Sequence, residues 1–123
     1  MPYRILLVDD SELVRHSLRS CFEQTVDWAV CGEAGDGREA IDQVRLLDPD
    51  LVIMDLSMPN MNGLDAAREI RRAYPNVLML MFTTFNSPAL ERQALAVGCS
   101  GVVSKSDVQS LFLSIGNLLD FKN

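Results

Sequence analysis

Runs of apolar residues with the length of β-strands alternate along the chain with segments whose apolar residues recur at three- and four-residue steps. The apolar runs cover residues 4–8, 28–34, 51–54, 77–82 and 101–104. A nearly continuous apolar run is typical of a strand buried on both faces of a sheet, and the longer period is typical of an amphipathic helix. Because each run is followed by a helical segment, the pattern predicts a (βα)5 chain. This is an α/β fold in which helices cover a parallel sheet.

The predicted helices carry apolar stripes and begin at residues suited to N-caps. The first stripe comprises Leu13, Val14, Ser17, Leu18, Cys21 and Phe22. The predicted caps are Asp10 or Ser11 for the first helix, Asp36 for the second, Ser87 for the fourth and Ser106 for the fifth. Side-chain oxygens of Ser and Asp at such positions accept hydrogen bonds from the first free N–H groups of a helix. Each predicted strand is therefore followed by a segment with its own helix start.

The composition fits one ordinary domain, and we expect a single domain over residues 1–123. The chain is 48% hydrophobic, which is enough to fill one core. With 11 Lys and Arg against 17 Asp and Glu, its net charge is −6, which opposes binding to a polyanion. No apolar run approaches the roughly 20 residues that cross a bilayer, and the first strand leaves no room for a signal peptide. We expect a soluble cytoplasmic protein that binds neither membranes nor, by this chain alone, nucleic acid.

The three cysteines, Cys21, Cys31 and Cys99, lie far apart among mostly apolar or small neighbours. This distribution is typical of cysteines that act as small hydrophobic core residues in a reducing compartment. Since the chain has one histidine and no close pair of cysteines, its composition argues against a zinc site.

Polar residues follow four of the five predicted strands. Asp9 and Asp10 follow the first, Asp55 the third, Thr83 the fourth and Lys105 the fifth. In open parallel sheets, ligands bind outside the carboxyl ends of the strands, near the point where the strand order reverses. If the strand order is 2-1-3-4-5, one of two common doubly wound orders, the first and third strands are neighbours there. The three carboxylates then converge.

Three carboxylates at one point cannot all stay ionised cheaply unless a cation lies among them. Oxygen ligands without His or Cys favour Mg2+, with Mn2+ as an alternative. Since Mg2+ commonly binds phosphate oxygens as well, the pattern points to phosphoryl chemistry. In that chemistry the Asp55 carboxylate would attack phosphorus, and Lys105 and Thr83 would contact the phosphoryl oxygens.

Each of these residues also has an ordinary structural explanation. An Asp pair at a strand end commonly forms a turn or a helix cap, and a single Thr or Lys after a strand carries little information. Complementary chemistry at one edge of the sheet favours the functional interpretation. Spacing alone leaves both interpretations open.

Four stretches resemble the receiver domain of two-component response regulators, and the resemblance extends over residues 4–119. They are residues 5–10 (Ile-Leu-Leu-Val-Asp-Asp), residues 52–63 (Val-Ile-Met-Asp-Leu-Ser-Met-Pro-Asn-Met-Asn-Gly), Thr83, and residues 98–101 (Gly-Cys-Ser-Gly) leading to Lys105. The resemblance implies a CheY-like, flavodoxin-like (βα)5 fold with a five-stranded parallel sheet in the order 2-1-3-4-5.

The resemblance also implies a role for each polar residue at this edge. Asp55 would be the phosphoacceptor, with a sensor histidine kinase or a phosphotransfer protein as the donor. Asp9 and Asp10 would hold Mg2+ directly or through water, together with Asp55 and the backbone carbonyl of Ser57. The side chains that would contact the phosphoryl group are those of Thr83 and Lys105. A domain of this kind is a phosphorylation-dependent switch that promotes its own phosphorylation and dephosphorylation, and it is not an enzyme acting on an external substrate.

The segment after the fourth predicted strand, Thr83-Thr84-Phe85, resembles receivers of the NarL/FixJ (LuxR-type) transcription regulators. The absence of proline after Lys105 agrees with this. In that subfamily a helix-turn-helix domain normally follows, and we expect residues 1–123 to hold the receiver domain without an output domain. We therefore expect the switch to control a partner protein or a DNA-binding domain outside this chain. A homodimer is one expected assembly.

Two positions depart from the family pattern. Val102 stands where receivers usually carry the Tyr or Phe whose rotamer reports phosphorylation. We therefore expect signalling to rely on Thr83 and the loop after it, with Phe85 as a candidate substitute. Ser106 stands where many receivers have a proline after a cis peptide bond. Because a non-proline cis bond costs about 2.5–4 kcal/mol, the Lys105–Ser106 bond is expected to be trans.

Other functions match parts of the pattern. A metal-dependent phosphatase of the haloacid dehalogenase type requires a second acid two residues after the nucleophile, where this chain has Ser57. A flavodoxin-like cofactor carrier binds phosphate after the first strand, but here the sequence Asp-Asp-Ser-Glu would repel it. The main alternative is a phosphorylation-independent, receiver-like interaction module. Against it, the expected acidic, hydroxyl and ammonium groups are all present.

Overall fold

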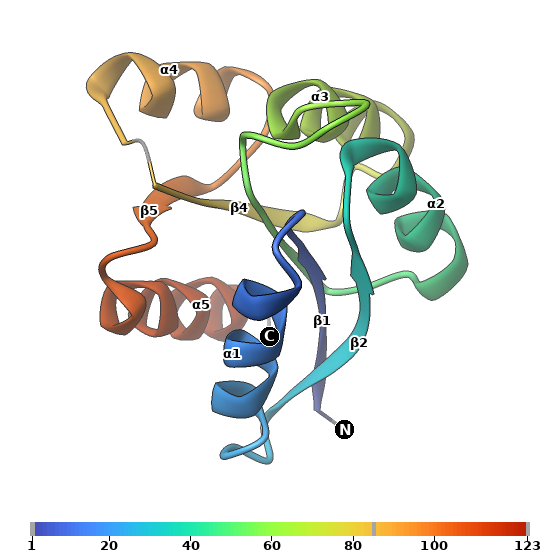
Figure 1. The fold of residues 1–123 in the computed structure, drawn as a ribbon. Helices are drawn as coiled ribbons and strands as arrows, with labels where there is room; N and C mark the ends of the chain where they lie inside the picture. The colour runs from blue at the N-terminus through green and yellow to red at the C-terminus, as the bar shows by residue number, and fades with distance from the viewer. Residues whose placement is uncertain (1, 85, 123) are drawn as a thin grey trace.

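A computed structural model of the chain describes residues 2–84 and 86–122, with side chains described as far as residue 120. Its centre is one sheet of five parallel strands in the order β2-β1-β3-β4-β5 (Figure 1). The strands are β1 (Tyr3–Val8), β2 (Trp28–Ala34), β3 (Leu51–Met54), β4 (Leu78–Thr83) and β5 (Gly101–Ser104). The predicted α/β class and strand order are therefore confirmed. The chain order reverses between β1 and β3, so the carboxyl ends of these two strands lie side by side.

In the part of the chain that the structure describes, five helices, one after each strand, cover the two faces of the sheet (Figure 1). On one face lie α1 (Glu12–Phe22) and α5 (Val108–Lys122). On the other face lie α2 (Gly37–Leu47), α3 (Gly63–Ala73) and α4 (Pro88–Ala96). None of the helices in the described ranges is long and apolar enough to span a bilayer.

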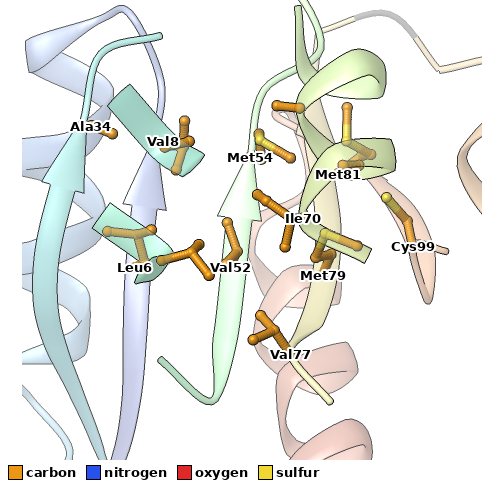
Figure 2. Packing of buried hydrophobic residues seen from close by; sticks show 14 of the residues in the cluster. Leu6, Val8, Ala34, Val52, Met54, Ile70, Val77, Met79, Met81 and Cys99 are labelled. Atoms are coloured by element: carbon orange, nitrogen blue, oxygen red, sulfur yellow. The ribbon is translucent and has the colours of Figure 1, made fainter. Parts of the chain in front are cut away.

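The buried side chains of the described residues form two clusters, one on each face of the sheet. Successive residues of a strand point to opposite faces, so Ile5 and Leu7 join one cluster while Leu6 and Val8 join the other. Figure 2 shows the second cluster, in which the inner strands pack against Ile70 of α3. Both faces of the inner strands are therefore buried, which explains their continuous apolar sequences.

The element boundaries differ from the predictions at a few positions. Strand β4 runs from Leu78 to Thr83, one residue later than predicted, so Thr83 is the last residue of the strand and does not follow it. On α1, Leu18 and Phe22 are buried, but Leu13 is 75% exposed and Cys21 is exposed. The predicted stripe was too wide, because α1 rests on the sheet along a narrow line and leaves the residues beside that line in solvent.

The caps of the first, second and fourth helices are confirmed. The side chains of Ser11, Asp36 and Ser87 each accept the backbone N–H three residues later. The predicted Ser106 cap was wrong. Asp107 immediately precedes α5 and accepts the Ser110 N–H at 3.1 Å, while the Ser106 hydroxyl pairs with Ser104.

The cysteines divide by location. Cys99 is buried, as predicted for a core residue, and burial raises the pKa of its thiol to about 11. Cys31 is half-buried in β2. For Cys21 the core prediction was wrong, since it lies on the outward side of α1.

Candidate functional site

The predicted site lies at the carboxyl ends of β1, β3, β4 and β5. Asp9 directly follows β1 and Asp55 directly follows β3, and the Asp55 N–H donates to the Val8 carbonyl at 3.0 Å. Asp9 is 3% exposed and Asp55 is 6% exposed. Two carboxylates from segments far apart in the sequence are thus buried together, as the strand order requires.

The Lys105 ammonium lies between these two carboxylates. Its Nζ is 2.6 Å from Asp9 Oδ2 and 3.0 Å from Asp55 Oδ2. The lysine is held by its backbone as well, because its N–H donates to the Thr83 carbonyl at 2.8 Å. Within the described residues, Lys105 thus supplies a positive charge beside two of the three converging acids, Asp9 and Asp55.

Burial and hydrogen bonding shift the pKa values of Asp9 and Lys105 in opposite directions. Burial raises the pKa of the Asp9 carboxyl, and hydrogen bonds from Lys105 and the Ser11 N–H offset part of the rise. Burial alone would lower the pKa of Lys105, but its hydrogen bonds to Asp9 and Asp55 outweigh that effect, and the pKa is raised. The lysine is therefore protonated at neutral pH, and the buried carboxylates keep a positive neighbour.

The third acid, Asp10, brings a carboxylate from the solvent side. One oxygen from each of Asp9, Asp10 and Asp55 lies within 4.8 Å of the others, and Asp10 is exposed while the other two are buried. Three carboxylate oxygens with an open side match the preference of Mg2+ for a few carboxylates and several waters. The donor set therefore fits the predicted cation.

The structure brings Thr83 to the same edge but leaves Val102 further down the sheet. Thr83 ends β4 and is 1% exposed. Val102 lies in β5 beside Met81 and packs against the cluster beneath α3 and α4. The predicted trans Lys105–Ser106 peptide bond is confirmed, since neither residue takes part in a cis bond. Phe85, the predicted substitute for an aromatic at Val102, lies outside the described residues.

The loop after β3, which carries the exposed Ser57, is held at both of its ends. The Gly63 N–H donates to the Leu56 carbonyl at 2.8 Å, and a Cβ at Gly63 would lie 2.2 Å from the Asp55 carbonyl oxygen. Only glycine permits this approach. Asn60, with φ of 66°, donates from its side chain to Asp36 at 2.7 Å. The loop is thereby fastened to the start of α2.

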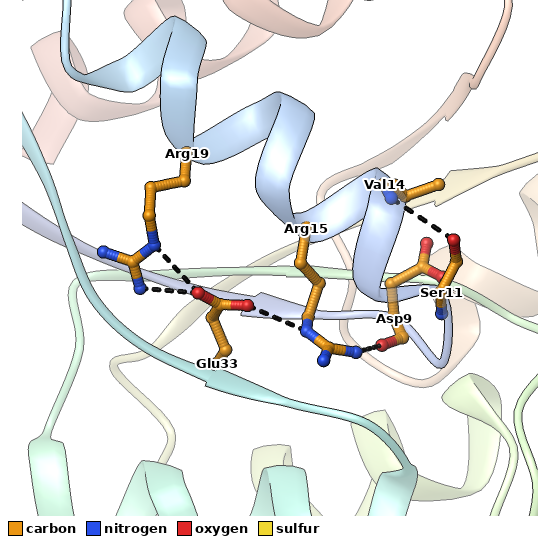
Figure 3. A network of polar contacts seen from close by, with 6 residues as sticks. All are labelled: Asp9, Ser11, Val14, Arg15, Arg19 and Glu33. Atoms are coloured by element: carbon orange, nitrogen blue, oxygen red, sulfur yellow. Dashed lines mark hydrogen bonds and ion pairs between the residues drawn. The ribbon is translucent and has the colours of Figure 1, made fainter.

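A set of ion pairs supports the loop that carries Asp9 and Asp10. Arg15 and Arg19, one turn apart on α1, both reach Glu33 on β2 (Figure 3). The Arg15 Nε donates to Glu33 at 2.8 Å, and its Nη1 donates to the Asp9 backbone carbonyl. Sequence analysis missed these residues. The available signal was Glu33 within an otherwise apolar strand and two arginines at four-residue spacing.

We expect Glu33→Gln to destabilise the protein by about 0.5–1 kcal/mol at pH 7, and the loss to shrink in acid. Burial opposes ionisation of Glu33, but hydrogen bonds from Arg19 and Arg15 outweigh it and hold its pKa below the ordinary 4.5. The unfolded chain therefore binds more protons near that pH. The contribution is complete above pH 4.5 and is lost as the pH falls through the folded pKa.

Urea unfolding of wild type and Glu33→Gln between pH 3 and 7 measures this difference. Asp42→Asn on α2 is the control, because the Asp42 carboxylate pairs with Arg45 at 3.9 Å on an exposed helix surface. A gap between wild type and Glu33→Gln that stays constant down to pH 3 would contradict the assignment.

Comparisons with known proteins agree on one family. The model of the response regulator receiver domain matches residues 5–115. The chain is 37% identical over 102 residues to the transcriptional regulatory protein LnrK of Bacillus subtilis, covering 83% of this chain and 46% of that protein. It is 35% identical over 105 residues to the chemotaxis protein CheY of Thermotoga maritima, covering 85% of this chain and 87% of that protein. The match thus spans less than half of the first relative and most of the second.

Solved structures show the same similarity. A LuxR-family two-component response regulator from an Aurantimonas species has a TM-score of 0.92 at 37% identity, covering 98% of this chain and 86% of that chain. The isolated REC domain of RcsB from Salmonella enterica serovar Typhimurium, determined in the presence of the phosphomimetic BeF3-, has a TM-score of 0.79 at 28% identity, covering 86% of this chain and 79% of that chain.

Proposed function

Since this chain belongs to the response regulator receiver domain family, we propose that Asp55 is the residue at which it accepts a phosphoryl group. Membership makes it a domain of phosphorylation-dependent signalling in two-component systems. The observation that supports the choice of Asp55 is its position. It is buried beside Asp9, within 3.0 Å of the Lys105 ammonium, at the edge of the sheet where the strand order reverses.

Asp9, Asp10 and Asp55 are the residues that would hold Mg2+, and the backbone carbonyl of Ser57 is the further proposed ligand. The all-oxygen donor set supports this assignment. When bound, the ion supplies positive charge that neutralises the phosphoryl oxygens and the surrounding carboxylates.

The proposed step is transfer of the phosphoryl group from a donor to Asp55. A carboxylate oxygen of Asp55 forms a bond to phosphorus while the bond from phosphorus to the donor breaks, and the departing group keeps the electron pair. With a histidine kinase or a phosphotransfer protein, the broken bond is the one between phosphorus and an imidazole nitrogen. Lys105 then exchanges Asp55 Oδ2 for a phosphoryl oxygen, and Thr83 contacts another.

On the output side, we propose that phosphorylation shifts an equilibrium between two conformations. The hydrogen bond from the Lys105 N–H to the Thr83 carbonyl, which joins β4 to β5 at this edge of the sheet, supports a role of Thr83 in that shift. Since Val102 offers no aromatic rotamer, the proposed switch relies on Thr83 and the loop after it. The controlled partner is either another protein or a DNA-binding domain joined to residues 1–123, and a homodimer stays a prediction.

Incubation with Mg2+ and acetyl phosphate tests the proposal. We expect the intact mass to increase by one phosphoryl group, and EDTA to abolish the increase because the site needs a divalent cation. Borohydride reduction of the acyl phosphate followed by peptide mapping should place the group at Asp55. A labelled site elsewhere would contradict the assignment.

The alternative of a phosphorylation-independent interaction module gives the opposite result. It predicts no adduct under conditions that label a control receiver. Asp9, Asp10 and Asp55 would then be structural acids neutralised by Lys105.

A further inference from the structure

Building on the proposed function, we propose that Arg15 is a positioning residue for the cation site formed by Asp9, Asp10 and Asp55. Arg15 reaches none of the three carboxylates. Instead it binds the backbone carbonyl of Asp9 and so fixes the peptide group that joins Asp9 to Asp10 (Figure 3).

The contacts of this peptide explain how Arg15 acts. On the N-terminal side, the Asp9 N–H donates to the Ala34 carbonyl at 3.0 Å, which continues the pairing of β1 with β2. The Asp9 carboxylate accepts the Ser11 N–H at 2.9 Å. The remaining polar group of Asp9 is its carbonyl, and Arg15 is its donor. The direction in which the chain leaves Asp9, and with it the position of Asp10, therefore depends on this bond.

Glu33 in turn orients the arginine. Arg15 donates through Nε to Glu33 and through Nη1 to the Asp9 carbonyl, so one planar guanidinium spans both partners. The Arg15 side chain is only 18% exposed, which restricts its alternatives. Arg15 thus connects a strand, a helix and the acidic turn in one rigid arrangement.

Arg19 provides a natural comparison on the same helix face. It also pairs with Glu33, at 2.7 Å, and its side chain is 37% exposed. Within the described residues, Glu33 is the partner of the Arg19 guanidinium, and Arg19 makes no hydrogen bond to Asp9. Removing Arg19 therefore removes a similar ion pair without touching Asp9.

If Arg15 is replaced by a neutral residue, an electrostatic role and a positioning role predict opposite changes in the affinity of the site for Mg2+. Removing a positive charge close to a cation site, and freeing Glu33, should by Coulomb attraction strengthen cation binding. Removing a group that orients the ligands should weaken it. Residues that orient metal ligands typically affect affinity by about 10- to 100-fold.

The test compares Arg15→Met with Arg19→Met, each of which keeps an unbranched apolar stem. We expect the Mg2+ dissociation constant, measured by isothermal titration calorimetry, to rise about tenfold in Arg15→Met and to stay within about twofold of wild type in Arg19→Met. Phosphorylation of Arg15→Met by acetyl phosphate should need more Mg2+ for half-saturation yet approach the wild-type rate at saturation. Mg2+ binding by Arg15→Met that equals or exceeds that of Arg19→Met would overturn the inference.

Arg15→Lys tests the same idea without a change of charge. A lysine has no planar guanidinium that could donate to the Asp9 carbonyl and to the Glu33 carboxylate at the same time. We therefore expect Arg15→Lys to bind Mg2+ more weakly than wild type, although the charge of the side chain is unchanged. Wild-type affinity in this variant would overturn the inference even if Arg15→Met failed to fold. A failure of the proposed function can be told apart from a failure of this inference. If the proposed function were wrong, the wild-type protein itself would show no Mg2+-dependent phosphorylation.

Discussion

Asp55→Asn is expected to reduce formation of the phosphoryl adduct below about one thousandth of the wild-type level, because removal of a covalent nucleophile has effects of this size or larger. An amide has the shape of the carboxylate but is a very poor nucleophile. Intact mass after incubation with Mg2+ and acetyl phosphate measures the loss. The same variant treated with a purified histidine kinase carrying labelled phosphate gives an independent reading.

Folding is not expected to explain that loss. Asp55 is buried next to Asp9, and the two carboxylates repel each other. The neutral amide of Asp55→Asn removes this repulsion, so we expect the thermal unfolding temperature of the variant to equal or exceed that of wild type. Asp65→Asn on the exposed start of α3 is a matched control that should be labelled like wild type. An adduct that persists in Asp55→Asn and maps to another residue would refute Asp55 as the phosphoacceptor.

Lys105→Met is expected to cost about 3 kcal/mol of unfolding free energy at pH 7 without divalent cations. Breaking a buried ion pair by removing one partner typically costs about 3–5 kcal/mol, because the other charge remains buried and uncompensated. Here the loss leaves two such charges, Asp9 and Asp55, which are paired with the lysine at 2.6 and 3.0 Å. Urea unfolding of the variant and wild type gives the difference.

Mg2+ should restore much of the lost stability. A ligand that binds only the folded state stabilises it in proportion to the logarithm of its concentration over the dissociation constant. Without the ammonium, the cation has no competitor for the carboxylates, so Mg2+ should stabilise Lys105→Met more than wild type. Stability equal to wild type in EDTA would contradict the role given to Lys105.

A second substitution separates charge from packing. Asp9→Asn combined with Lys105→Met removes one of the two unpaired charges, so the double variant should be more stable than Lys105→Met alone. Arg45→Met on α2 is the control, because it removes a positive charge from an exposed position. It should change stability by less than about 0.5 kcal/mol, since its pair with Asp42 is 3.9 Å long and exposed.

The repeating pattern of the sequence was sufficient to predict the (βα)5 architecture, and the resemblance to the receiver domain supplied the strand order. Continuous apolar runs such as Leu51–Met54 can only be satisfied by burial on both faces of a sheet, which requires helices on each side. Local chemistry located most helix starts, because capping by Ser11, Asp36 and Ser87 involves residues three positions apart. The prediction of Ser106 as the cap of α5 failed, because the next residue, Asp107, can cap as well and only the path of the chain decides which residue precedes the first helical turn.

The sequence by itself determined the alternation of strands and helices and the residue types at the strand ends, because these are local properties. Its family was identified from the resemblance of four stretches to the receiver domain. The tertiary structure decided how those residues meet. Lys105 and Asp55 are 50 positions apart, and Arg15 reaches both Glu33 and the Asp9 carbonyl from another element. Such contacts depend on the strand order, the packing of α1 on the sheet and the reach of particular rotamers. Only the folded chain sets all of these at once.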